Sequence, residues 1–119
     1  MPQRSENLDR MFHALADPTR RAVLARLAQG PASVCDLAEP FDMALPSFVQ
    51  HLKVLEASGL VRSQKAGRVR TCEFDLAALE AAEGWIAEQR ALWEARLDRL
   101  EELIAELKAE ERNPDPTED

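Results

Sequence analysis

Apolar residues recur at intervals of three and four along most of this chain, which is the period of a helix packed on one side. The pattern predicts a first helix over residues 7–16 and a second that starts at Asp17-Pro18 and ends at Gly30-Pro31. Asp caps helix N-termini, and Pro is favoured at the first helical position. Ala32-Ser33 is expected to form a brief strand, and Ser33-Val-Cys-Asp36 is a capping box that opens a third helix.

The most informative segment runs from residue 42 to residue 61. It predicts one amphipathic helix closed by Ser58-Gly59, preceded by a tight turn at residues 42–44. At 100° per residue, one face carries Phe48, Leu52 and Leu55, and the opposite face carries Pro46, Gln50 and Lys53.

The period changes from helical to alternating after this helix. Residues 60–65 and 68–74 alternate on either side of Ala66-Gly67, which predicts a β-hairpin. A helix-turn-helix followed by a basic hairpin presents one helix to the major groove with a wing beside it. The expected fold is therefore mainly α with a small β-hairpin wing, a winged helix-turn-helix, and the expected role is a DNA-binding regulator.

The chain is helix-forming from Leu76 to about Lys108, interrupted only by Gly84. One row of apolar residues is spaced by seven, and a companion row is broken by Glu83 and Arg90. Such a stripe exceeds what one small domain can cover, so a partner helix is implied beyond Trp85, with core packing in the first two turns. The predicted homodimer surface comprises Leu8, Met11, Phe12, Ile86, Trp93, Leu97, Leu100 and Ile104. The alternative for the two tryptophans is a hydrophobic effector pocket.

Length and composition fit a small regulator. The expected organisation of the 119 residues is a tail at 1–6, the DNA-binding domain at 7–75, a dimerisation helix at 76–108 and a disordered acidic tail at 109–119. The chain shows no apolar run of membrane-spanning length and no signal-peptide core, so a cytoplasmic location is expected. Its two cysteines argue against a disulfide scaffold.

The net charge of −7 is unevenly distributed. Residues 1–74 carry ten Lys and Arg against eight Asp and Glu, whereas residues 75–119 carry five against fourteen. Four cations, Arg62, Lys65, Arg68 and Arg70, fall within the expected wing. The acidic second part therefore does not exclude a basic DNA-binding edge.

Several motifs, in this order, carry a resemblance to a known family. They are Ala14-Leu-Ala-Asp-Pro-Thr-Arg-Arg21, Asp36-Leu-Ala38, His51-Leu-Lys-Val-Leu55, Gly59-Leu-Val61 and Gly67-Arg68. Together they resemble the ArsR/SmtB family of bacterial winged helix-turn-helix repressors over residues 8–108. The resemblance implies a homodimer that binds palindromic double-stranded DNA operators, placing it at the bacterial nucleoid. It extends to a subgroup whose last helix is rich in Trp and acidic residues and lacks obvious metal ligands.

The candidate DNA contacts lie on the predicted recognition helix and wing. They are Ser47, Val49, Gln50, His51 and Lys53 together with Arg62, Lys65, Arg68 and Arg70. Gln suits an adenine edge, Lys suits guanine or phosphate, and Val suits a thymine methyl group. His51 is as well explained by burial or a phosphate contact as by base recognition. The resemblance also shows a departure: Ala44, Leu45 and Val49 stand where relatives more often carry polar side chains, which shifts recognition toward DNA shape.

The chain lacks both complete metal-binding motifs that its relatives use to sense metal ions. Relatives that respond to metals carry a Cys-Val-Cys box where this chain has Ser33-Val34-Cys35, and residues 75–119 contain no His for the other known metal site. No metal or other cofactor is therefore expected. Cys35 and Cys72 form a possible thiol sensor if the strand near Ser33 pairs with the second wing strand; the alternative is that both are small buried hydrophobes.

Two other function classes agree less well with the sequence. A protein-interaction module would use the exposed Leu45 and Val49, but the four cations of the wing argue against it. An enzyme is disfavoured because the chain has no phosphate-binding glycine loop or nucleophile elbow, and only His13 and His51 as histidines.

Overall fold

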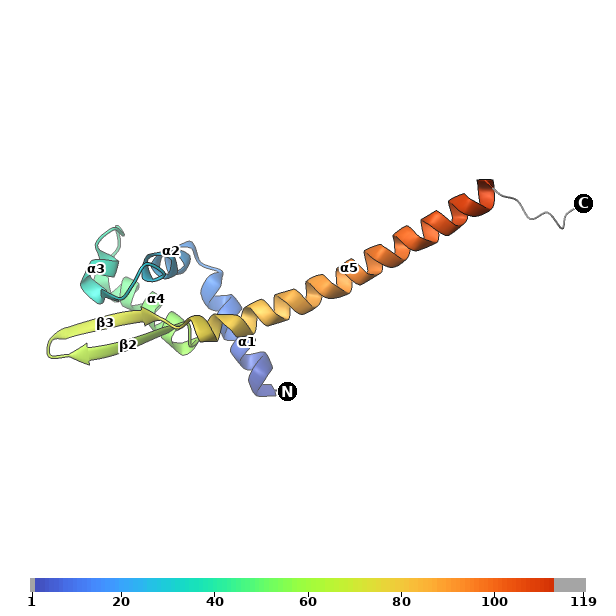
Figure 1. The fold of residues 1–119 in the computed structure, drawn as a ribbon. Helices are drawn as coiled ribbons and strands as arrows, with labels where there is room; N and C mark the ends of the chain where they lie inside the picture. The colour runs from blue at the N-terminus through green and yellow to red at the C-terminus, as the bar shows by residue number, and fades with distance from the viewer. Residues whose placement is uncertain (1, 113–119) are drawn as a thin grey trace, which may run out of the picture. The chain divides into compact units, whose positions relative to one another are not determined.

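A computed structural model describes residues 2–112, with side chains from residue 6 onward. Its elements, in order, are α1 (Pro2–Leu15), α2 (Pro18–Leu27), β1 (Ala32–Ser33), α3 (Val34–Ala38), α4 (Leu45–Ala57), β2 (Val61–Ala66), β3 (Val69–Phe74) and α5 (Leu76–Arg112), as Figure 1 shows. This order confirms the predicted winged helix-turn-helix. The chain forms two compact units, one up to Glu83 and one from Gly84 onward.

Element bounds differ from the predictions mainly at the ends of the chain. Helix α1 begins at Pro2 rather than at residue 7, so most of the expected N-terminal tail is helical. Helix α5 continues to Arg112, four residues beyond the predicted end at Lys108. The rest of the expected acidic tail lies outside the described residues.

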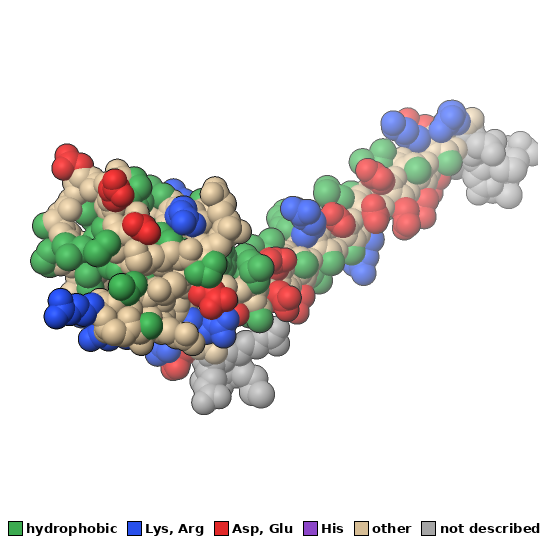
Figure 2. Space-filling model, turned by 60° about the vertical axis from the view of Figure 1, so that its left-hand side comes forward, with side chains coloured by type: hydrophobic (Ala, Val, Ile, Leu, Met, Phe, Trp, Pro, Cys, Tyr) green, Lys and Arg blue, Asp and Glu red, His purple; other side chains and the backbone are tan. Residues whose placement is uncertain are grey.

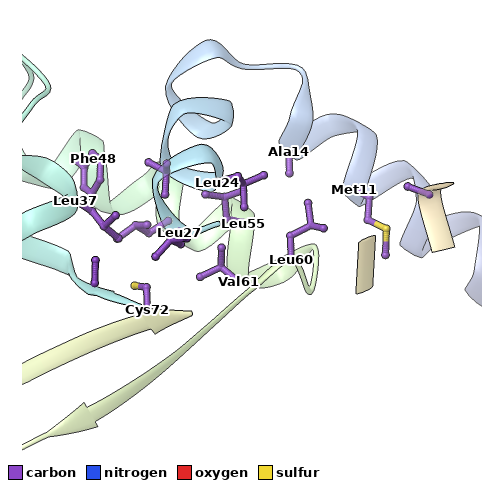
Figure 3. Close-up of a cluster of buried hydrophobic side chains, with 14 residues drawn as sticks. Met11, Ala14, Leu24, Leu27, Leu37, Phe48, Leu55, Leu60, Val61 and Cys72 are labelled. Carbon is purple, nitrogen blue, oxygen red and sulfur yellow. The ribbon is translucent and has the colours of Figure 1, made fainter. Parts of the chain in front are cut away.

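The first unit is built around the apolar face of α4. Phe48 and Leu55 are 0% exposed and Leu52 is 4% exposed, which confirms the predicted buried face. In Figure 3, side chains from α2, α3, α4 and β2 converge on this face. Phe41, in the turn before α4, packs against Phe48 with ring centroids 5.5 Å apart. The first turns of α5 complete this core through Ala82, which is 2% exposed.

Three antiparallel strands form the sheet in the order β1-β3-β2. The brief strand β1, which the sequence predicted, pairs with β3, and Ala32 lies opposite Cys72. In the wing hairpin, Ala66 faces Val69, leaving Gly67 and Arg68 as a two-residue turn. Gly67 has φ of +65°, which a type II′ turn requires at its first position. Arg68 therefore lies in the turn and not in the strand, one residue away from the prediction.

Arg20 joins three helices through one side chain. Its Nε donates to the carbonyl of Ala14 at 2.8 Å and its Nη2 to the carbonyl of His13 at 2.9 Å. These carbonyls belong to the last turn of α1, where helical partners run out. The remaining nitrogen, Nη1, lies 3.1 Å from Nδ1 of His51 on α4. At 9% exposure Arg20 is a buried cation, and each of its three guanidinium nitrogens has a hydrogen-bond partner. A buried charge is tolerated when it is hydrogen-bonded in this way.

The second unit is the remainder of α5. Its apolar residues stay largely exposed, with Ile86 at 47%, Trp93 at 62% and Leu100 at 53%. Figure 2 shows acidic, basic and hydrophobic side chains interspersed along this helix. The guanidinium of Arg96 lies 5.8 Å from the ring centroid of Trp93, one turn away. This exposed stripe is the surface on which the dimer prediction depends.

Among residues 2–112, no helix is both long enough and apolar enough to cross a membrane.

Replacing Arg20 with Ala should lower the free energy of unfolding by about 2–4 kcal/mol, because it removes a buried cation that donates to the carbonyls of Ala14 and His13 and to the Nδ1 of His51. Urea titration followed by circular dichroism measures the change. Arg21 is the matched control: it is exposed and donates one hydrogen bond, to the carbonyl of Leu15 at 2.9 Å. Arg21→Ala should cost less than about 1 kcal/mol. Equal costs for the two variants would contradict the role given to Arg20.

Candidate nucleic-acid interface

The helix-turn-helix consists of α3, the turn at residues 39–44, and α4. Ser33 caps α3, its Oγ accepting from the Asp36 N–H at 3.1 Å, as the capping-box prediction required. Helix α4 begins without a side-chain cap, because Ala44 occupies that position. On the face opposite the core, Ser47, Gln50 and Lys53 are exposed. The fold therefore leaves the predicted base-contacting face of α4 open to solvent.

His51 differs from the other candidates on α4. Its side chain is 23% exposed, and its Nδ1 lies 3.7 Å from the Asp17 carboxylate and 3.1 Å from Arg20. Because a guanidinium only donates, Nδ1 acts as the acceptor, and the proton of the neutral ring lies on Nε2. His51 thus anchors the recognition helix to the start of α2, and only its Nε2–H remains for a DNA phosphate. Of the alternatives that the sequence left open for His51, a partly buried histidine agrees with this placement.

Asp17 is the second member of this anchor. Its carboxylate accepts from the Arg20 N–H at 3.0 Å as the N-cap of α2. That backbone hydrogen bond, aided by the charge of Arg20, holds the pKa of Asp17 below its ordinary value of 3.8 against the opposing effect of burial. The carboxylate consequently stays ionised throughout the neutral range and fixes the N-terminus of α2.

The wing divides the four predicted cations between its two faces. Lys65 pairs with Arg70 across the hairpin, on the same side as the inward-facing Cys72. Arg62 pairs with Glu73 on the opposite side and lies 3.8 Å from the Asp75 carboxylate. Arg62 therefore lies on the face of the hairpin opposite Lys65 and Arg70.

A groove lies between the recognition helix, the start of α3 and the tip of the wing. Its cavity volume is about 560 Å³. The lining residues come from all three elements: Ser33, Val34, Cys35, Val49, Leu52, Lys53, Glu56, Arg68, Val69 and Arg70. The groove brings together four of the predicted DNA contacts, namely Val49, Lys53, Arg68 and Arg70. Ser47, Gln50, His51, Arg62 and Lys65 are not among its lining residues.

The two cysteines occupy different environments. Cys35 is exposed and lines the groove, whereas Cys72 is fully buried beneath the sheet. Burial raises the pKa of the Cys72 thiol, with a smaller contribution from the charge of Glu56. A buried thiol with a raised pKa is a poor nucleophile, so Cys72 fits the interpretation as a small buried hydrophobe. Within residues 2–112, no cluster of three or more His, Cys, Asp or Glu side chains is arranged to hold a metal ion.

Several known proteins are similar to this chain in sequence and in fold. A helix-turn-helix domain family matches residues 15–64. The HTH-type transcriptional regulator Rv2034 of Mycobacterium tuberculosis is 45% identical over 73 residues, which cover 61% of this chain and 68% of that protein.

Two solved structures have a fold similar to that of this chain. An ArsR family transcriptional regulator, RHA00566, is 59% identical with a TM-score of 0.72, covering 74% of this chain and 97% of that one. The homodimeric winged helix-turn-helix DNA-binding domain of Mb0332 from Mycobacterium bovis is 26% identical with a TM-score of 0.56, covering 79% and 84%. The chain belongs to the ArsR/SmtB family of transcriptional regulators. By that relationship it is a DNA-binding transcriptional regulator.

Sequence reasoning missed the functions of some residues and misassigned another. Arg20 belongs to the quoted family motif, but nothing in its local pattern indicated contacts with α1 and α4. Glu56 and Val69 were not recognised as groove residues. Met11 was expected on the dimer surface, but at 5% exposure it packs inside its own protomer, so that assignment is not kept.

Replacing Asp17 with Asn should cost about 0.5 kcal/mol at neutral pH, since Asn still caps the helix but lacks the charge that favours its N-terminus. A carboxyl whose pKa is lowered by folding contributes stability above its unfolded pKa and loses it as the pH falls through the folded value. The difference between wild type and Asp17→Asn should therefore shrink below about pH 4.

Urea unfolding at a series of pH values measures this, with the exposed Asp42→Asn as the control. A difference that stays constant down to pH 3 would contradict the assigned effect on Asp17.

Proposed function

We propose that this chain is a homodimeric repressor that binds a palindromic operator through α4 and the wing. The observation that carries the proposal is the placement of Gln50 and Lys53 on the open face of α4, with Arg68 and Arg70 on the adjacent wing. A recognition helix flanked by cations combines base contacts with phosphate contacts. The proposal assigns binding and no reaction, in keeping with its regulator relatives.

The base contacts would come from the exposed face of α4. Gln50 can pair with an adenine edge and Lys53 with guanine, while Ser47 serves either a base or a phosphate. Val49 is half-buried in the groove wall and offers a surface for a thymine methyl group. The Nε2–H of His51 would donate a hydrogen bond to a DNA phosphate.

The wing would bind the DNA backbone. Lys65, Arg68 and Arg70 lie at or near the hairpin tip, and the Nη1 of Arg70 donates to Ser63 Oγ at 2.8 Å. This bond limits the freedom of the guanidinium before DNA arrives, which reduces the entropy lost on binding. Arg62 is left out of the proposed contacts because it lies on the other face.

Dimerisation would bring two recognition helices to successive major grooves, about 34 Å apart on the operator. The proposed surface on α5 consists of Ile86, Trp93, Leu97, Leu100 and Ile104, each at least 47% exposed. From Trp93 to Leu107 this row follows the heptad spacing of a coiled coil. A separate part of the proposed surface lies in the first unit and consists of Phe12 of α1, which is 36% exposed, and the half-buried Leu8. The homodimeric state of the Mb0332 domain supports the proposal of a dimer.

Substituting Gln50 or Lys53 with Ala should weaken binding to an operator selected from a random duplex library by roughly tenfold each, since a good base contact contributes about 1–3 kcal/mol. Fluorescence anisotropy measures the affinity. In the same assay, Arg68→Ala with Arg70→Ala should lower the slope of log affinity against log salt by about 2. Arg62→Ala is the control on the opposite wing face and should leave that slope unchanged. Wild-type operator affinity in both α4 variants would exclude α4 as the recognition helix.

Introducing charge into the α5 stripe should dissociate the dimer. Leu100→Glu places a carboxylate at the centre of the proposed interface, and it should raise the dimer dissociation constant by at least about a hundredfold, because a buried unpaired charge costs several kcal/mol. Sedimentation velocity measures the change. Ala95→Glu adds the same charge at an exposed position off the stripe and should leave the dimer intact. Dimers of unchanged stability in Leu100→Glu would place the interface elsewhere.

A further inference from the structure

The groove beside the recognition helix has properties that DNA binding alone does not require. Its volume of about 560 Å³ falls in the range of small-molecule sites, roughly 300–1,000 Å³. Every residue that lines it belongs to the first compact unit. The shape of the groove is therefore set within one protomer.

The groove has apolar walls on two sides. Val34 comes from α3, and Val49 and Leu52 come from α4. Val69 of β3 also borders the groove, but the strand alternation that separates Arg62 from Arg70 directs its side chain to the face of Arg62. An apolar ligand lying between these walls would remove hydrocarbon surface from water on both sides.

The polar groups of the groove favour one sign of charge. Lys53, Arg68 and Arg70 contribute three positive charges, against one negative charge from Glu56. A ligand with an apolar body and an anionic head would satisfy both the walls and the cations. A cationic ligand of the same shape would meet a net repulsion.

We propose that this groove binds a small amphipathic carboxylate and that such a ligand and DNA exclude one another. The hydrocarbon body would lie between Val34 on one side and Val49 and Leu52 on the other, and the carboxylate would pair with Lys53, Arg68 and Arg70. The exclusion rests on the proposed function, because the same three cations are assigned there to DNA. A ligand that occupies them removes contacts that dominate the affinity for the phosphate backbone. The regulator would then be released from DNA without a metal ion.

Cys35 provides a direct measure of occupancy in the absence of DNA. Its exposed thiol lines the groove, and the buried Cys72 serves as an unreactive reference. Decanoate should slow alkylation of Cys35 by iodoacetamide at least about fivefold, since a bound ligand covers most of the lining. Decyltrimethylammonium, which has the same chain length and the opposite charge, should slow it less than twofold. Peptide mass analysis assigns the modified cysteine.

The charge of Glu56 gives a matched pair of variants. Glu56→Gln removes the one carboxylate of the groove, so half-protection of Cys35 should require about threefold less decanoate. Glu80→Gln removes an exposed carboxylate on α5 and should leave that concentration unchanged. The same response in both variants would overturn the assignment of the anion to this groove.

The second part of the proposal is tested by adding decanoate to the complex with the selected duplex. Loss of anisotropy at the concentrations that protect Cys35 supports mutual exclusion, and protection with DNA still bound overturns it. Absence of protection, or equal protection by the ammonium compound, overturns the ligand site. Protection of Cys35 in a protein that binds no duplex would leave the ligand site standing and refute the proposed function instead.

Discussion

The position of the recognition helix depends on the contact between Arg20, Asp17 and His51. Arg20 closes the last turn of α1, its backbone N–H completes the cap of α2 through Asp17, and its guanidinium reaches α4 through His51. Helices α1, α2 and α4 contact one another pairwise, so their relative rotation is limited by packing and by these hydrogen bonds. Directional hydrogen bonds from a planar group restrict that rotation, because each demands a defined geometry. The orientation of α4 is thus linked to a residue that lies outside the helix-turn-helix.

An acidic protein can bind DNA when its charges are segregated along the chain. The negative excess falls in residues 75–119, most of which form the second compact unit, while the wing cations belong to the first. Salt screens charges over about 8–10 Å under ordinary conditions, so the local balance at the groove decides what binds there. The net charge of the whole chain describes its behaviour at a distance and says little about the interface.

Local patterns were sufficient to predict most of the architecture. The period of the apolar residues indicated the helices, and the alternation after Leu60 indicated the hairpin, because both depend on neighbouring residues only. The start of α1 at Pro2 was missed, since its first turn has no apolar period to detect. The contacts of Arg20 were missed for a different reason: its partners come from α1 and α4, and only the tertiary fold brings them together.

The placement of Arg62 was available in the sequence but was overlooked. Side chains alternate along a strand, so a buried Val61 directs Arg62 to the opposite face. Similar reasoning on the other strand places Arg70 with the buried Cys72. The groove, by contrast, combines residues from α3, α4 and β3, and no linear pattern indicates a cavity of that kind.

Helix α4 separates residues that maintain the fold from residues that face solvent. Phe48, Leu52 and Leu55 hold it from below and His51 fastens its side, while Ser47, Gln50 and Lys53 remain exposed. Substitutions at exposed positions usually change stability by less than about 0.5 kcal/mol. Gene duplicates of such a regulator can therefore diverge at these three positions without first accumulating compensating changes in the core. A scaffold of this kind favours the diversification of many regulators from one ancestor.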